Sequence, residues 1–407
     1  MIYHLHELHR AALAPWRFVA EANQHMLRHP FNPMSYTTVG RTAAASMDVF
    51  EQATRQHRKP KFGIHHVTVD DKVYAVEEEI VMRENFCQLR HFHRESASGP
   101  RVLVVAPLSG HFATLLRGTV QALVADHDVY VTDWRDACMA PVKDGTFDLD
   151  DYIDYVIRFL QFLGPDTHVL AVCQPSVPVL AAVSLMSADG DPATPSSMTL
   201  MGGPVDTRRS PTAPNRLAKS RSIDWFERTM IARVPVTYPG FTRQVYPGFL
   251  QLSGFMAMNL DRHVGAHIDH FFDLVRGDGD SAMAHRQFYE EYRAVMDLPA
   301  EYYLQTVKTV FQDHALPLGR MRHRERKIEP RAIEKTALMT VEGELDDISG
   351  IGQTEAAQKL CVSLANDRRC HYEQPGVGHY GVFNGSRWRT QIYPRIRDFI
   401  RANGRTG

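Results

Sequence analysis

The chain contains few cysteines, and this limits the classes of protein to which it can belong. Only five cysteines occur in 407 residues, and no two of them form a C-x-x-C pair. They are Cys87, Cys138, Cys173, Cys361 and Cys370. Their odd number and wide spread argue against a disulfide framework and against a structural zinc site made of paired cysteines. Free thiols fit a reducing compartment, so the expected location is the cytoplasm.

Long apolar runs and an excess of one charge are also missing. No apolar run reaches about 18 residues, so no membrane span is predicted. The first residues, MIYHLHELHRAALAPWRF, show no secretory signal. Lys and Arg number 46 against 47 Asp and Glu, which gives no basic face for a nucleic-acid partner. The 21 histidines indicate no metal site by their number alone, and we predict no metal and no cofactor.

The organisation of the chain is that of an α/β domain with an insertion. Residues 1–60 have helical spacing of apolar residues, and we expect a helix docked on the main domain, with a surface-binding amphipathic helix as the alternative. Residues 61–206 and 335–407 are predicted to form the two parts of the core. Residues 207–334 are predicted to form an inserted helical cap. The apolar stripe of the first segment consists of Leu5, Leu8, Ala11, Ala12, Trp16 and Phe18.

Short apolar runs alternate with helix-like segments through the core. The strand-like runs are RVLVVA (101–106), DVYVT (128–132), THVLAV (167–172), SMTLM (197–201), KTALMTV (335–341) and CHYE (370–373). Strands that alternate with helices predict an α/β fold with a mostly parallel, doubly wound sheet. Residues 61–93 have a period of two and are expected to add antiparallel strands at its edge.

One stretch carries a candidate nucleophile. In residues 167–182, THVLAVCQPSVPVLAA, an apolar strand leads into Cys173, and a helix-like run follows Pro175. Strand, sharp turn, nucleophile and helix is the order of the nucleophile elbow of α/β-hydrolases, whose usual pattern is G-x-S-x-G. Here both glycines are absent and cysteine replaces serine. The alternative is a buried cysteine at the end of a core strand.

The order of two later residues favours catalysis over that alternative. In α/β-hydrolases the acid and the histidine follow the nucleophile along the chain. Asp346 comes after the strand-like run 335–341, and His379 lies in a glycine-rich loop after the last strand. His379 would accept the thiol proton of Cys173, and Asp346 would fix the tautomer of the imidazole. Asp347 is the immediate rival of Asp346 for this role.

Other residues are candidates for contacts with an acyl substrate. Backbone N–H groups stabilise an oxyanion, and we expect one from Gln174 and a second from Ser109, with Leu108 and Gly110 as alternatives. His111 is expected either to touch substrate or to bond to the backbone. Two YPGF motifs in the insertion are expected either to belong to the core of the cap or to line an apolar groove. Their aromatic residues are Tyr238, Phe241, Tyr246 and Phe249.

Beyond these patterns, the chain resembles the intracellular polyhydroxyalkanoate (poly(3-hydroxybutyrate)) depolymerases of bacteria over nearly its whole length. The segments that carry the resemblance are HELHRAALAPWRFVAE, VVAPLSGHFATLLRGTV, VYVTDWRDA, AVCQPSVPVLAA, the YPGF pair, VEGELDDIS and GVGHYGVFNG. The resemblance implies an α/β-hydrolase fold and a triad of Cys173, Asp346 and His379. It also implies that the partner is the stored polyester and that the protein acts at the surface of its granules in the cytoplasm.

The resemblance predicts a mechanism and leaves alternatives open. Cys173 would form a 3-hydroxyacyl thioester, which water or coenzyme A would accept. One alternative is a polyhydroxyalkanoate synthase, a family that uses the same residue types but keeps glycines around its cysteine. A generic cytosolic esterase or thioesterase is the second alternative, and a granule-coating protein with a vestigial triad is the third.

Overall fold

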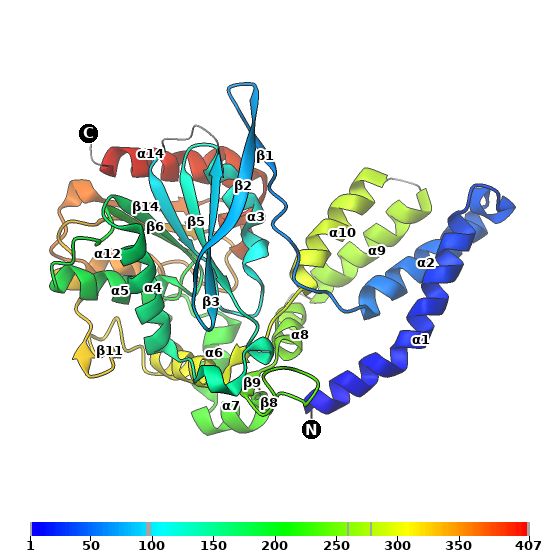
Figure 1. Ribbon diagram of the computed structural model, residues 1–407, viewed down its shortest axis with the longest axis horizontal. Coiled ribbons are helices and arrows are strands. Elements are labelled where there is room, and N and C mark those ends of the chain that lie inside the picture. The colour runs from blue at the N-terminus through cyan, green and yellow to red at the C-terminus, as the bar shows by residue number, and fades with distance from the viewer. Residues whose placement is uncertain (1, 95–98, 259, 277–278, 405–407) are drawn as a thin grey trace.

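A nine-stranded sheet runs through the centre of the computed structural model, which describes residues 2–94, 99–258, 260–276 and 279–404 (Figure 1). The strands lie in the order β1-β2-β3-β5-β4-β6-β7-β13-β14. The first three pair antiparallel, β3 is antiparallel to β5, and all pairs from β5 to β14 are parallel. The strands are β1 (His66–Val69), β2 (Lys72–Arg83), β3 (Cys87–Arg94), β4 (Arg101–Val105), β5 (Asp128–Trp134), β6 (Thr167–Val172), β7 (Ser197–Met201), β13 (Ala337–Gly343) and β14 (Arg369–Gln374).

Helices cover both faces of this sheet. The chain moves one way along the sheet from β4 to β5 and the other way from β5 to β6, so right-handed crossovers put the connecting helices on opposite faces. Helix α3 (Arg117–Val124) lies on one face with α14 (Tyr393–Asn403), because the Tyr393 hydroxyl donates to Asp126 at 2.5 Å. The other face holds α4 (Leu149–Leu163), α5 (Ser176–Ala188) and α12 (Ala356–Leu360).

The central strands are apolar because both of their faces are covered. Every residue of β6, β7 and β13 is buried. Parallel strands covered by helices read as continuous apolar runs, which is the pattern seen in the sequence. The predicted α/β-hydrolase fold, with its mostly parallel and doubly wound sheet, is confirmed.

Local signals in the sequence set the ends of several elements. Asp148 caps α4: its carboxylate accepts from the Asp151 N–H at 2.9 Å, and Asp151 accepts from the Asp148 N–H at 3.0 Å. Asp70 and Asp71 adopt left-handed φ values of 47° and 59° and form the tight turn between β1 and β2.

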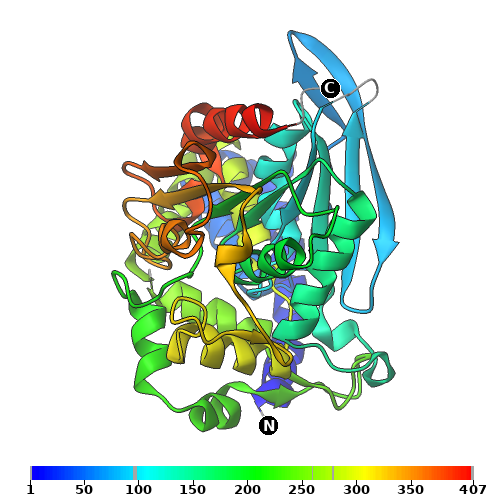
Figure 2. The same ribbon diagram turned by 90° about the vertical axis from the view of Figure 1, so that its left-hand side faces the viewer.

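Most of the segment between β7 and β13 forms a separate layer at the carboxyl ends of the parallel strands, below the sheet in Figures 1 and 2, while its helices α9 and α10 lie to the side of the sheet in Figure 1. Three short strands in it pair in the order β10-β9-β8. Its elements are α6 (Ala213–Ser220), α7 (Ile223–Met230), β8 (Ala232–Arg233), β9 (Gln244–Tyr246), α8 (Gly248–Met258), α9 (Leu260–Arg276), α10 (Gly279–Arg293), β10 (Leu298–Pro299), α11 (Ala300–Thr306), β11 (Arg322–His323) and β12 (Arg326–Lys327).

Two helices of this insertion join the N-terminal helices in a projection that we call the helical arm, which consists of α1 (Ile2–Arg28), α2 (Thr38–Thr54), α9 and α10 (Figure 1). Arg286 of α10 donates to Asp48 of α2 at 2.7 Å, and Arg55 donates to Glu290 at 2.6 Å. Pro15 lies inside α1, and Figure 1 shows α1 bent, as an internal proline bends a helix.

The apolar stripe of α1 is exposed. Leu5, Leu8, Trp16 and Phe18 are 57%, 65%, 66% and 72% exposed, so the prediction that this helix docks its stripe on the main domain is wrong. The first turn of α1 holds it instead, because Tyr3 is buried and its hydroxyl donates to Asp297 at 2.8 Å. Tertiary packing decides which face of such a helix is covered, and the stripe alone cannot show that.

All five cysteines are free thiols. Within the described residues, no helix combines the length and apolarity needed to cross a bilayer.

Candidate active site

Cys173 occupies a strained turn between β6 and α5. Its φ is +67°, in the left-handed region that residues with a side chain rarely adopt. Its backbone N–H donates to the carbonyl of Met201 at 2.7 Å, which fixes the turn against the neighbouring strand β7. The Cys173 side chain is partly exposed and lines a cavity, so the structure does not place it as a fully buried core cysteine. Strained backbone of this kind concentrates at functional sites.

The space that this turn needs comes from glycines on a neighbouring strand end. A Cβ added to Gly203 would lie 2.0 Å from the Ser176 Oγ and 2.8 Å from the Cys173 carbonyl oxygen. Gly202 has a φ of +56° and lies against His379. A Cβ added to Gly202 would lie 3.3 Å from the His379 Cε1. Gly202 and Gly203 directly follow the strand β7, and nothing in their local sequence points to the site. Only the pairing of β6 with β7 brings this glycine pair to Cys173.

His379 and Asp346 are joined by a hydrogen bond. The His379 Nδ1 lies 2.8 Å from the Asp346 Oδ2, and the Asp346 side chain is fully buried. The other carboxylate oxygen of Asp346 accepts from the N–H groups of Ile348 and Ser349 at 2.9 Å and 2.8 Å, which fixes its orientation. Asp347 is exposed. Of the two adjacent carboxylates, Asp346 is therefore the one that faces the imidazole.

The surroundings of His379 favour its protonated form. Burial by itself would lower its pKa, but the charges of Asp346 and Cys173 and the hydrogen bonds to both residues raise the pKa well above its usual value. The structure thus places Cys173 in the same cavity wall as His379, which is hydrogen-bonded to Asp346. Such an arrangement can move a proton between the sulfur and a leaving group.

Cys173 and His379 line a cavity of about 490 Å³. That volume lies within the range of roughly 300–1,000 Å³ usual for small-molecule sites. The wall is predominantly apolar and comes from both the core and the insertion. Its apolar side chains include Leu108, Leu217, Phe226, Tyr246, Phe255 and Leu298. The arrangement suits an apolar acyl chain whose carbonyl reaches the sulfur.

The two expected oxyanion donors, Gln174 and Ser109, both line this cavity. Gln174 follows Cys173 directly, just before the first turn of α5. Ser109 belongs to a loop that is tied to the insertion, because the Met296 N–H donates to the Gly110 carbonyl at 2.7 Å. Gly110 has a φ of +107°, and an added Cβ would lie 2.4 Å from the Gln251 Oε1. The loop therefore needs glycine there to keep its path past the cavity.

His111 bonds to the backbone, as one of its two expectations has it, and it also faces the cavity. It lines the cavity, and its Nε2 lies 3.0 Å from the carbonyl oxygen of Tyr292. Because a carbonyl only accepts, Nε2 carries the proton. Burial lowers the pKa of His111 to about 4 despite this hydrogen bond, so the ring is neutral near neutral pH. A neutral imidazole in the wall can orient a substrate without adding charge.

The two YPGF motifs differ in their positions. Tyr246 lines the cavity, but Tyr238, Phe241 and Phe249 are not among its lining residues. Tyr238 and Phe249 pack edge-on against Tyr3 of α1, with ring centroids 6.0 Å and 5.6 Å away, and Phe241 is half exposed. Of the two expectations for these motifs, packing within the structure describes Tyr238 and Phe249, which contact the helical arm, and Phe241 lies outside the cavity.

Tyr302 of α11 is a cavity residue that the sequence did not point to. It is fully buried, and burial raises the pKa of its hydroxyl well above its usual value. Its ring stacks with that of Tyr152 at 5.7 Å. Nothing in the local pattern separates Tyr302 from its neighbour Tyr303, so no signal in the sequence could have identified it.

Comparison with known proteins gives one family and several distant structural likenesses. Residues 202–404 match the family described as PHB de-polymerase C-terminus. No curated protein matches the chain. Among solved structures, DcsB in complex with its substrate analogue has 13% identity and a TM-score of 0.46, with 81% of this chain and 99% of that chain covered.

Two further structures show the same level of likeness. The meta-cleavage product hydrolase from Pseudomonas fluorescens IP01 has 12% identity and a TM-score of 0.42, and the match covers 80% of this chain and 97% of that chain. A thermophilic esterase from Thermogutta terrifontis has 11% identity and a TM-score of 0.42, and the match covers 81% of this chain and 99% of that chain.

Proposed function

Because the chain belongs, over residues 202–404, to the family described as PHB de-polymerase C-terminus, we propose that it is an ester hydrolase that cleaves stored poly(3-hydroxybutyrate). The observation that carries the proposal is the strained turn of Cys173 in the wall of an apolar cavity, next to the hydrogen-bonded pair of His379 and Asp346. Nucleophile, base and orienting acid are the parts of an acyl-transfer triad.

In the first half of the reaction, the sulfur of Cys173 attacks an ester carbonyl of the polymer. His379 takes the thiol proton on Nε2, because Nδ1 is occupied by Asp346. The oxyanion forms against backbone N–H groups of Gln174 and of the loop that holds Ser109. The carbon–oxygen bond then breaks, and the leaving hydroxyl end of the polymer takes the proton from His379. A 3-hydroxyacyl thioester remains on Cys173.

In the second half, an acceptor releases the acyl group. Water gives up a proton to His379 and attacks the thioester, and the sulfur leaves and regains that proton. A thioester keeps its acyl-transfer potential, so the thiol of coenzyme A is the alternative acceptor. The products would be the free 3-hydroxy acid in the first case and its coenzyme A thioester in the second.

An apolar polyester also explains the surfaces around the cavity. Burial of apolar area is worth about 25 cal/mol per Å², so side chains such as Phe226, Tyr246 and Phe255 would hold the chain without charge. A granule, however, has to be reached as a surface. The exposed stripe of α1, with Leu8 and Trp16, is the apolar face that we propose for this contact.

The experiment is hydrolysis of native amorphous poly(3-hydroxybutyrate) granules, with soluble products followed in the presence and absence of coenzyme A. Wild type is compared with Cys173→Ala and with Cys370→Ala. Cys370 is an exposed free thiol on β14 and serves as the matched control. We expect release by wild type and by the control variant, and none by Cys173→Ala.

The alternatives give different results in the same set of assays. Polymer formation from a 3-hydroxyacyl coenzyme A would indicate a synthase. Activity on short esters with none on granules would indicate a generic esterase or thioesterase. Granule binding without any turnover would indicate a coating protein. Undiminished release by Cys173→Ala would contradict the proposed nucleophile.

A further inference from the structure

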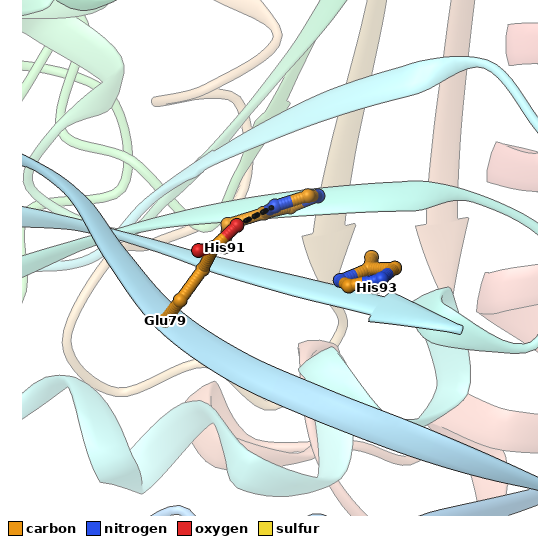
Figure 3. A group of neighbouring side chains, drawn as sticks. All are labelled: Glu79, His91 and His93. Carbon is orange, nitrogen blue, oxygen red and sulfur yellow. Dashed lines mark hydrogen bonds and ion pairs between the residues drawn. The ribbon is translucent and has the colours of Figure 1, made fainter. Parts of the chain in front are cut away.

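Two histidines and two glutamates face one another across β2 and β3, far from the catalytic cavity. The register of this antiparallel pair sets Glu79 opposite His91 and Glu77 opposite His93. Residues two apart on a strand point to the same face, so all four side chains lie on one face of the sheet. Figure 3 shows Glu79 reaching across to His91, with His93 next along the strand.

The potential ligand atoms of Glu79, His91 and His93 lie within 4.8 Å of one another. The His91 Nδ1 is 3.1 Å from the Glu79 Oε1. Bonds of about 2.0–2.2 Å in a tetrahedral site place ligand atoms about 3.4 Å apart, so this pair is already at a suitable distance. Glu79 is 59% exposed, and its side chain can turn to bring the group together.

A carboxylate orients the imidazole of His91 from the far side, and a second carboxylate lies near the imidazole of His93. The His91 Nε2 lies 2.5 Å from Asp128 on β5, which leaves Nδ1 to face Glu79. The His93 Nε2 lies 3.9 Å from Glu77, while its Nδ1 is buried and has no hydrogen-bond partner among the described residues. A histidine that binds a metal through one nitrogen and donates to a carboxylate through the other is the usual arrangement around zinc.

The side chains next to His91 are also negatively charged. The carboxylates of Asp128 and Glu79 both lie within hydrogen-bond distance of the His91 ring. The ring of His91 stacks on Tyr130 at 4.2 Å with an interplanar angle of 3°, which holds it in place before any ion binds. The imidazole of His91, which is already held in position, the imidazole of His93 and the carboxylate of Glu79 are ligands that Zn²⁺ accepts.

From this geometry we propose that Glu79, His91 and His93 bind one Zn²⁺ ion through a carboxylate oxygen and the two Nδ1 atoms, with water in the fourth position. Asp128 and Glu77 act as outer partners of the histidines. The ion joins β2 to β3 and, through Asp128, to β5. Because His91 pairs with Tyr130 near the start of β5, the site is at the opposite end of the sheet from Cys173. Its role is therefore structural, and it does not depend on the proposed function.

The test uses full-length protein without an affinity tag, stripped of metal by a chelator. Zinc binding is measured by competition with a chromophoric chelator, and Co²⁺ is used to report the ligands by its absorption spectrum. We expect one site of micromolar affinity, weakened about 10-fold or more in His93→Gln and in Glu79→Gln. His66→Gln, an exposed histidine on the neighbouring strand β1, is the control and should bind as wild type does.

Three outcomes would overturn the proposal. Equal affinity in His93→Gln, Glu79→Gln and wild type would show that the ion binds elsewhere, and a thiolate-to-cobalt band lost in Cys173→Ala would place it at the catalytic pair. Binding only at millimolar zinc would show that these residues form cross-strand ion pairs without a metal. Zinc should also raise the Tm of wild type, and of Cys173→Ala, but leave that of His93→Gln unchanged.

Discussion

Replacement of Asp346 by Asn tests whether the Asp346 carboxylate fixes the tautomer of His379, the proposed base. Asn has the same shape, so its carbonyl oxygen can still accept from the N–H groups of Ile348 and Ser349. Its amide nitrogen then faces the His379 Nδ1, where the carboxylate oxygen was. Because that nitrogen only donates, Nδ1 must become an acceptor and Nε2 must keep the proton. The imidazole then cannot take the proton of Cys173.

The size of the loss follows from the bond that changes. A hydrogen bond to a charged group is worth about 1.5–3 kcal/mol, which corresponds to roughly 10- to 150-fold in rate. The wrong tautomer adds to this, and the same exchange in a serine triad lowers kcat roughly ten-thousand-fold. We therefore expect kcat on a short soluble ester to fall between about 100-fold and about 10,000-fold, with little change in Tm.

Alkylation of Cys173 by iodoacetamide provides a second readout that needs no substrate. It should slow in Asp346→Asn at pH 7, because the thiol loses its base. Asp347→Asn is the matched control, since Asp347 is the exposed neighbour, and it should keep wild-type activity. Activity and alkylation within threefold of wild type in Asp346→Asn would show that Asp346 does not set up His379 as the base.

Three further perturbations follow from the contacts described above. Gly203→Ala places a Cβ 2.0 Å from the Ser176 Oγ and should abolish ester hydrolysis by displacing the start of α5, whereas full activity would contradict the elbow geometry. The double variant Leu8→Gln/Trp16→Gln should lose binding to granules in a sedimentation assay while it keeps hydrolysis of a soluble ester; equal loss of both would argue against a surface contact. Burial, together with the charge of a neighbouring carboxylate, raises the pKa of Asp297 from 3.8 to about 7, so the folded state favours the protonated form and stability falls as the pH rises from about 4 to about 7. Asp297→Asn should therefore show a smaller fall of Tm between pH 5 and pH 8 than wild type, and parallel curves would show that this carboxyl is not responsible.

The sequence could predict elements whose signals are local. The apolar runs of the central strands, the capping residue Asp148 and the paired Asp70 and Asp71 each specify a few neighbouring residues, and the structure has these elements there. Chain order alone, combined with the α/β-hydrolase pattern, also pointed to Asp346 and His379. It favoured Asp346 but could not exclude Asp347, because that choice depends on which carboxylate accepts from the backbone of the turn.

The sequence could not predict features that depend on packing between distant segments. The stripe of α1 has the same spacing whether it is covered or exposed, and only the structure shows that α1 packs on α2 while the stripe stays exposed. The repeated YPGF motif looks equivalent in both copies, yet Tyr246 lines the cavity while Tyr238 packs on α1. Gly203 leaves space for the turn at Cys173 only because β7 pairs with β6, and the local sequence does not show that pairing.

The central claim is that Cys173 carries the acyl group of the polymer during turnover, and the most direct measurement is to trap that group. Protein acting on poly(3-hydroxybutyrate) granules is quenched in acid within the first turnovers, digested and mapped by mass spectrometry. We expect a 3-hydroxyacyl group on the peptide that contains Cys173, removable by hydroxylamine and absent from His379→Ala. Hydrolysis of the granules with the acyl group found on another residue would contradict this claim.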